Sequence, residues 1–224
     1  MLMRESNDGT RSVMSIRFLS HLVALLTLFS ASAHAQPVER PTIMAFGDSL
    51  TAGYNLPAGL GFAPQLEDAL RREGIAARVI DAGVSGETTS AGLERIDWVL
   101  DGLEEKPDLL ILELGANDML RVLDPALTER NLRAMLDILA EREIPVLLAG
   151  MQAAPNYDPA YVTAYNAIFP RLAQEYDVVF YPLFIDGVAG QPDKLLPDGL
   201  HPNYEGIKVM VTRILPSVRQ ALSR

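Results

Sequence analysis

With 224 residues, the chain is long enough to bury the core of one domain and too short for two domains of ordinary size. Its 49% hydrophobic and 21% charged residues exclude a disordered or fibrous chain and are typical of a soluble globular protein. A net charge of −10 makes nucleic acid an unfavourable partner, and the lack of cysteine excludes disulfides, thiolate metal sites and a cysteine nucleophile.

The first 35 residues have the pattern of an export signal. Arg11 and Arg17 precede an apolar run over residues 18–29, and the Ala-His-Ala sequence of residues 33–35 places small residues where signal peptidase cleaves. We therefore expect cleavage before Gln36, a periplasmic or secreted protein, and one mature domain that begins at residue 36.

An uncleaved membrane anchor is the alternative interpretation of this segment. The apolar run is shorter than the ~20 residues that a membrane-spanning helix needs, and no basic stop-transfer flank follows it. The sequence therefore predicts no stable membrane insertion after cleavage. Met14 offers a second translation start, which leaves a signal of more ordinary shape.

From residue 41 onward, short apolar runs alternate with longer amphipathic stretches, as in β-α-β units and mainly parallel sheets. The predicted strands cover residues 42–46, 78–81, 109–114, 146–150 and 178–181. The predicted helices cover residues 64–72, 91–103, 125–142, 160–175 and 203–222. We expect an α/β fold with a doubly wound sheet of order 2-1-3-4-5, whose ligands bind outside the carboxyl ends of strands 1 and 3.

The loop after the first strand places Ser49 in the sequence Phe-Gly-Asp-Ser-Leu-Thr-Ala-Gly-Tyr, residues 46–54. Glycine permits a tight turn there, and a serine beyond the end of a buried strand is exposed enough to be a nucleophile. The structural alternative is that Asp48 or Ser49 caps a helical turn and Gly47 makes the bend. A phosphate-binding loop is disfavoured because no Gly-Lys-Ser/Thr follows.

The loops after the second and third strands contain candidate hydrogen-bond donors for an oxyanion. Gly83 and Gly86 each let the backbone approach a ligand and present an amide to it. Asn117 follows the third strand, and its side chain can donate into the crevice that faces Ser49. The alternatives are a glycine that is needed only for its positive φ, and an asparagine that closes its own turn.

The segment before the last predicted helix contains Asp198 and His201, and His201 is the one histidine left once residues 1–35 are removed. Pro202 disfavours the α conformation at His201, so we expect a loop. Asp198 can accept the Nδ1 proton of His201, which leaves Nε2 to take the proton of Ser49. The alternative is a purely structural Asp-His pair. A metal site is disfavoured because the sequence shows no metal-ligand spacing.

Together these segments resemble the sequence blocks of the SGNH hydrolases, also called GDSL esterases. The matching stretches are Gly-Asp-Ser-Leu at 47–50, Ser-Gly-Glu-Thr at 85–88, Gly-Ala-Asn-Asp at 115–118 and Asp-Gly-Leu-His at 198–201. The resemblance implies a flavodoxin-like three-layer α/β/α fold, no cofactor, and a catalytic triad of Ser49, His201 and Asp198. It also implies an oxyanion site formed by Ser49, Gly86 and Asn117, with Gly83 as the alternative to Gly86.

Within that family the chain is similar to the bacterial group of acyl-CoA thioesterase I, lysophospholipase L1 and arylesterase. The length, the export signal and the stretches at residues 85–88, 113–115 and 201–203 support this placement. We therefore expect a hydrolase domain over residues 36–224 that acts on small carboxylic esters or thioesters. The alternatives are a carbohydrate O-deacetylase on the same fold and a non-catalytic binding protein, and the complete set of four blocks disfavours the latter.

Overall fold

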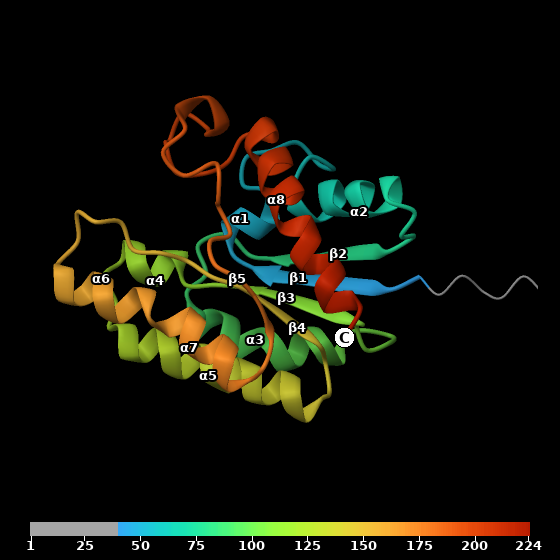
Figure 1. Ribbon diagram of the computed structural model, residues 1–224, viewed down its shortest axis with the longest axis horizontal. Coiled ribbons are helices and arrows are strands. Elements are labelled where there is room, and N and C mark those ends of the chain that lie inside the picture. The colour runs from blue at the N-terminus through green and yellow to red at the C-terminus, as the bar shows by residue number, and fades with distance from the viewer. Residues whose placement is uncertain (1–39) are drawn as a thin grey trace, which may run out of the picture. The chain divides into compact units, whose positions relative to one another are not determined.

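The computed structural model describes residues 40–224, and the predicted signal peptide and its cleavage site lie outside these residues. The described residues form a five-stranded parallel sheet of order β2-β1-β3-β4-β5 with helices on both faces (Figure 1). The strands are β1 (Thr42–Gly47), β2 (Arg78–Gly83), β3 (Leu109–Glu113), β4 (Val146–Ala149) and β5 (Val179–Tyr181). The predicted α/β class and the strand order 2-1-3-4-5 are confirmed.

Two groups of helices cover the two faces of the sheet. On one face α2 (Phe62–Arg72) packs against α8 (Tyr204–Leu222), and on the other α3 (Thr89–Asp101) packs against α5 (Pro125–Glu141), which in turn contacts α7 (Ile168–Glu175) (Figure 1). Three short helices lie in loops, namely α1 (Ser49–Ala52), α4 (Ala116–Leu120) and the 3₁₀ turn Pro192–Lys194, and α6 (Pro159–Asn166) precedes α7.

The central strands are buried on both faces, which explains why they are continuous apolar runs in the sequence. All five residues of β3 are buried, and so are residues 43–47 of β1. A parallel strand covered by helices on each side has no solvent-facing position, so alternation of polar and apolar residues is lost. The edge strand β2 has exposed or partly exposed residues throughout, in agreement with its more polar sequence.

One predicted helix is wrong, because residues 160–175 form α6 and α7 with a break at Ala167. Pro170 lies in the first turn of α7 and has no N–H to donate to the carbonyl of Asn166 four residues earlier. The helical spacing of apolar residues continues across the break, so the periodicity alone does not reveal it. Among residues 40–224, no helix combines the length and apolar character needed to span a membrane.

The ends of three neighbouring strands place the loops of interest side by side. Gly47 at the end of β1 pairs with Gly83 on β2 and with Glu113 on β3. A Cβ at Gly83 would lie 2.4 Å from the backbone nitrogen of Ala52 and 2.9 Å from the carbonyl oxygen of Asp48. Helix α1 therefore rests directly on the end of β2, and only glycine fits at that contact.

Candidate active site

Ser49 is the first residue of α1, at the carboxyl end of β1. The carboxylate of Asp48 caps this helix by accepting a hydrogen bond from the N–H of Leu50 at 3.0 Å. Gly53 ends the helix in the left-handed conformation with φ +70°, and its N–H donates back toward the carbonyl of Ser49. A helix of one turn between these two caps fixes the direction of the Ser49 side chain. Ser49 itself is 8% exposed.

The structure brings Ser49, His201 and Asp198 into one chain of hydrogen bonds. His201 Nε2 lies 2.9 Å from Ser49 Oγ, and His201 Nδ1 lies 2.7 Å from Asp198 Oδ2. The ring of Tyr54 packs on the imidazole with a centroid distance of 4.2 Å. A carboxylate on Nδ1 fixes the tautomer in which Nε2 is free to accept the serine proton. This arrangement can activate Ser49 as a nucleophile.

Asp198 also stabilises the turn that holds His201. Its Oδ1 accepts hydrogen bonds from the N–H groups of Leu200 at 2.9 Å and His201 at 3.0 Å. These two backbone hydrogen bonds, followed by the contact with the imidazole, lower the pKa of Asp198 to about 2. Asp198 is therefore ionised at neutral pH, as an acceptor for the Nδ1 proton must be. The pair lies in the loop that the sequence predicts before the last helix.

The two candidate glycines differ in what their amides do. The N–H of Gly83 donates to Asp81 Oδ1 at 2.9 Å, so it is already engaged. Gly86 occupies the third position of a turn from Val84 to Glu87 with φ +85°, and within residues 40–224 its N–H donates to no acceptor. A type II turn requires this positive φ at its third position. The geometry therefore favours Gly86 over Gly83 as a donor to a bound oxyanion.

Asn117 lies in the first turn of α4, and its side chain points to Asp48 rather than to its own turn. Asn117 Nδ2 donates to Asp48 Oδ2 at 3.0 Å, across 69 positions of sequence. In the described chain the side chain makes no hydrogen bond to its own backbone, so the turn-closing interpretation has no support. Because an amide nitrogen carries two hydrogens, one remains to donate to a ligand beside Ser49.

Asp48, which the sequence alone suggests only as a helix cap, also orients Asn117. It is fully buried, and burial raises its pKa to about 6, against the lowering effect of the hydrogen bonds from Leu50 and Asn117. The hydrogen bond from Asn117 Nδ2 to Asp48 orients the side-chain amide, so that its nitrogen rather than its oxygen lies on the side of Asp48 and Ser49. The only sequence signal for this role is its position beside Ser49.

A second buried network, which sequence reasoning missed, joins α3, α4 and α5. Asp118 Oδ1 accepts from the hydroxyls of Thr89 at 2.5 Å and Thr128 at 3.1 Å, and its Oδ2 accepts from the N–H of Thr89 at 2.8 Å. Asn131 donates to the Thr89 hydroxyl at 3.1 Å. Asp118 therefore holds the helix that carries Asn117 against the start of α3, three residues after Gly86.

Arg95 fixes the other side of the Gly86 turn. Its guanidinium forms an ion pair with Glu87 at 2.6 Å and donates to the carbonyls of Ala82 at 2.9 Å and Gly47 at 3.2 Å. The same group lies 3.9 Å from the centroid of the Phe46 ring, as in a cation–π contact. Arg95 thus connects the ends of β1 and β2 to the turn that presents the Gly86 amide.

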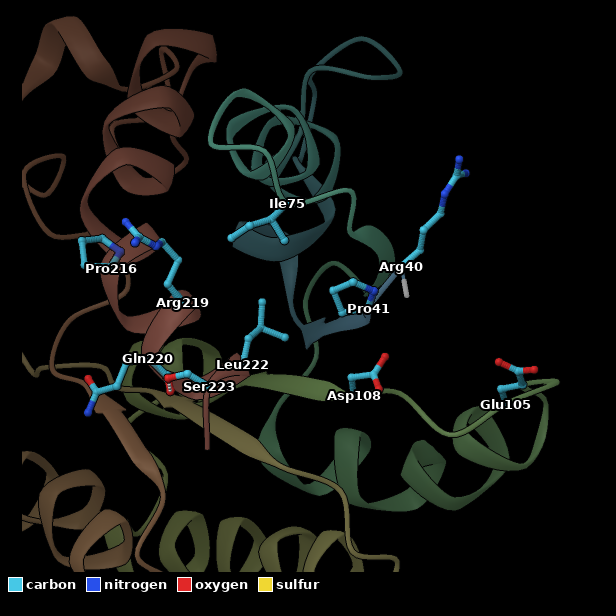
Figure 2. A pocket seen from close by; sticks show the side chains of 10 residues that line it. All are labelled: Arg40, Pro41, Ile75, Glu105, Asp108, Pro216, Arg219, Gln220, Leu222 and Ser223. Carbon is cyan, nitrogen blue, oxygen red and sulfur yellow. Dashed lines mark hydrogen bonds between the residues drawn. The ribbon is translucent and has the colours of Figure 1, made fainter. Parts of the chain in front are cut away.

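The described residues contain no group of three or more histidine, cysteine or acidic side chains arranged to hold a metal ion. A hollow of about 1240 Å³ lies at the opposite end of the sheet, where Pro41 and Asp108 precede β1 and β3 and Leu222 ends α8 (Figure 2). None of the triad residues lines it. Ser49 and His201 lie instead at the carboxyl ends of the strands, where ligands bind in sheets of this topology.

Known proteins are similar to this chain over the segment that contains the site. The family model for GDSL-like lipases and acylhydrolases matches residues 45–209. An arylesterase of Vibrio mimicus is 36% identical over 184 residues, which cover 82% of this chain and 90% of the relative. Thioesterase 1/protease 1/lysophospholipase L1 of Escherichia coli K12 is 34% identical over 181 residues, or 81% of each chain. The crystal structure of AlinE4, an SGNH-hydrolase family esterase, has a TM-score of 0.70 and 47% identity over 82% of this chain and 97% of AlinE4.

Replacing Gly86 tests whether its amide acts in the site. A Cβ there meets only Arg121, at 4.0 Å, so Gly86→Ala is disfavoured by its φ alone, by about 1–2 kcal/mol. We expect this strain to turn the Ser85–Gly86 peptide over, which would move its N–H away from an oxyanion bound at Ser49. We expect an ester-hydrolysis kcat lower by roughly 10²-fold, on the scale of one lost oxyanion donor.

The matched control is Gly74→Ala, because Gly74 has φ +82°, has open space within 4 Å of where a Cβ would lie, and precedes the amino end of β2. It should lose similar thermal stability and keep kcat. If both variants keep kcat after correction for the folded fraction, Gly86 does not contribute to the site.

Proposed function

The chain belongs to the GDSL-like lipase and acylhydrolase family and is an ester-hydrolysing serine enzyme of the SGNH type, and we propose that Ser49, His201 and Asp198 are its catalytic triad. The observation that carries the proposal is the continuous hydrogen-bond chain from Asp198 through His201 to Ser49 Oγ. It contains a nucleophile, a base and a group that orients the base, in the geometry that acyl transfer requires.

In the first half of the reaction, Ser49 Oγ attacks the carbonyl carbon of the substrate while His201 Nε2 takes its proton. The ionised Asp198 stabilises the imidazolium that forms. The oxyanion accepts hydrogen bonds from the N–H of Ser49, the N–H of Gly86 and Nδ2 of Asn117. His201 then gives its proton to the leaving alcohol or thiol, and the acyl group remains on Ser49.

In the second half, a water molecule attacks the acyl-enzyme while His201 Nε2 again acts as the base. The same three donors hold the second oxyanion. When the tetrahedral intermediate collapses, the proton returns to Ser49 and the carboxylic acid leaves. The reaction consumes one water per ester and needs no further reactant.

The proposed substrates are small carboxylic esters or thioesters, of the kinds named for the arylesterase and thioesterase relatives. Two features support neutral acyl substrates over polyanionic ones, namely the net charge of −10 and the apolar side chains exposed around the loops of the site. These side chains include Tyr54, which packs on the imidazole of His201, and Leu200, which precedes His201 in the chain. No observation on residues 40–224 favours a carbohydrate O-deacetylase.

Export is the second part of the proposal. Residues 1–35 act as a cleaved signal peptide and residues 36–224 as the hydrolase domain, which places the mature enzyme in the periplasm or medium. The support is the sequence of the segment itself, which has basic, apolar and small-residue parts in the order typical of a secretory signal peptide.

Triad substitutions test the catalytic proposal. Ser49→Ala and His201→Ala should each lower kcat on p-nitrophenyl esters by roughly 10⁴-fold or more, and the double variant should lose little more because the residues act as a unit. Asp198→Asn should cost about 10⁴-fold through the wrong imidazole tautomer. Ser223→Ala is the control, because Ser223 lies beside the hollow at the opposite end of the sheet. Additive losses, or turnover of acetylated xylan in preference to p-nitrophenyl esters, would contradict the proposal.

The export proposal predicts the N-terminus of the mature enzyme. Protein recovered from periplasm or culture medium should begin at Gln36 when its N-terminal sequence is determined. Replacing Ala33 and Ala35 with large residues should leave the uncleaved form, since signal peptidase reads small side chains at these positions. A mature enzyme that retains residues 1–35 rules the assignment out.

A further inference from the structure

Glu113 is a buried acid that the proposed reaction does not use. It is the last residue of β3 and has no exposed surface. Its Oε2 accepts a hydrogen bond from the hydroxyl of Thr51 at 2.8 Å and another from the N–H of Asp48 at 3.3 Å. A single carboxyl oxygen therefore binds residues on both sides of Ser49.

The fit around this carboxyl group is tight. A Cβ on Gly47 would lie 2.4 Å from Glu113 Oε2 and 2.2 Å from Thr51 Oγ1, so the carboxyl group packs directly against the main chain of Gly47. There is thus no free space between the side chains of Glu113 and Thr51 and the main chain of Gly47. A shift of the Glu113 side chain would shift the segment that carries Ser49.

No cation neutralises Glu113 in the described chain. Arg95 of α3, whose guanidinium donates to the carbonyl of Gly47, is instead paired with Glu87 and lies over the ring of Phe46. The other ionisable groups that face Glu113 are Asp48, before α1, and Tyr165 of α6, whose hydroxyl donates to the carbonyl of Gly115. The paired residue on β4, Ala149, is apolar.

The surroundings of the second carboxyl oxygen of Glu113 determine whether the carboxyl group is charged or neutral. Within residues 40–224, Glu113 Oε1 has no hydrogen-bond partner. A buried carboxylate with one oxygen unpaired costs far more free energy than a neutral acid with the same defect. Burial first, and then the proximity of Asp48, raise the pKa of Glu113 well above its ordinary value.

We propose that Glu113 is a positioning residue for the nucleophile, held as a neutral carboxylic acid whose carbonyl oxygen anchors the Asp48–Thr51 segment. This inference rests on the proposed role of Ser49. A neutral acid supports the turn without placing a second negative charge beside Asp48, the group that orients Asn117. Glu113 contacts no reacting atom and acts only through the main chain and Thr51.

Comparison of Glu113→Ala with Glu113→Gln tests the positioning role. Loss of the anchor in Glu113→Ala should lower kcat by roughly 10- to 100-fold, as expected for a displaced catalytic group, with little change in KM. Glu113→Gln supplies the same carbonyl acceptor without a charge and should restore kcat. Thr51→Val removes one of the two hydrogen bonds at nearly constant volume and should lower kcat by a smaller factor than Glu113→Ala.

Leu112→Ala is the matched control, because Leu112 is equally buried in the same strand but points to the opposite face of the sheet. It should lose thermal stability through its cavity and keep kcat in the folded fraction. If Glu113→Ala keeps kcat as Leu112→Ala does, or if Glu113→Gln is as inactive as Glu113→Ala, the positioning role is wrong. An active Ser49→Ala variant would instead overturn the proposed function itself.

The pH dependence of thermal stability provides a separate test of the charge state of Glu113. Glu113 ionises freely in the unfolded chain at a pKa of about 4.3 but resists ionisation when folded, so wild type loses stability as pH rises above that value. Glu113→Gln lacks this loss, so its Tm relative to wild type should rise as the pH increases above about 5, where Glu113 ionises in the unfolded chain. A relative Tm that stays flat or falls as pH rises would show that Glu113 is ionised in the native state.

Discussion

The adjacency of Gly47, Gly83 and Glu113 at the ends of three neighbouring parallel strands is the constraint on which the rest of the site depends. Glycine at 47 leaves room for the Glu113 carboxyl group, and glycine at 83 lets α1 rest on the end of β2. These contacts fix the one-turn helix that begins at Ser49. His201, 152 positions further along the chain, then meets a serine whose direction is already determined.

Three carboxyl groups near Ser49 differ because their surroundings differ. Asp198 is partly exposed and bound by two backbone N–H groups, which keep it ionised as the partner of the imidazole. Asp48 is buried but receives hydrogen bonds from Leu50 and Asn117, so its pKa rises only to about 6. Glu113 is buried with one oxygen unpaired, and its pKa is raised furthest. Because their surroundings shift the three pKa values differently, charged and neutral carboxyl groups can lie close together in one site.

The strands and the candidate site residues could be predicted from the sequence, because apolar runs and unusual loop residues are local signals. Contacts between distant residues could not be predicted in this way. The hydrogen bonds from Asn117 to Asp48 and from Thr51 to Glu113 join residues 69 and 62 positions apart, which become neighbours only when β1 and β3 pair. The choice between Gly86 and Gly83 likewise depended on the Asp81 side chain, which engages one amide and leaves the other.

Ser49 is the one residue that becomes acylated in the proposed reaction, and covalent trapping tests this most directly. An alkyl phosphonate ester carrying a good leaving group should add once per chain, and peptide mass mapping should place the adduct on Ser49. Esterase activity should fall in proportion to labelling, and His201→Ala should slow the labelling because Nε2 no longer takes the serine proton. Complete inactivation without an adduct on Ser49, or an adduct on another serine such as Ser85, would contradict the assignment.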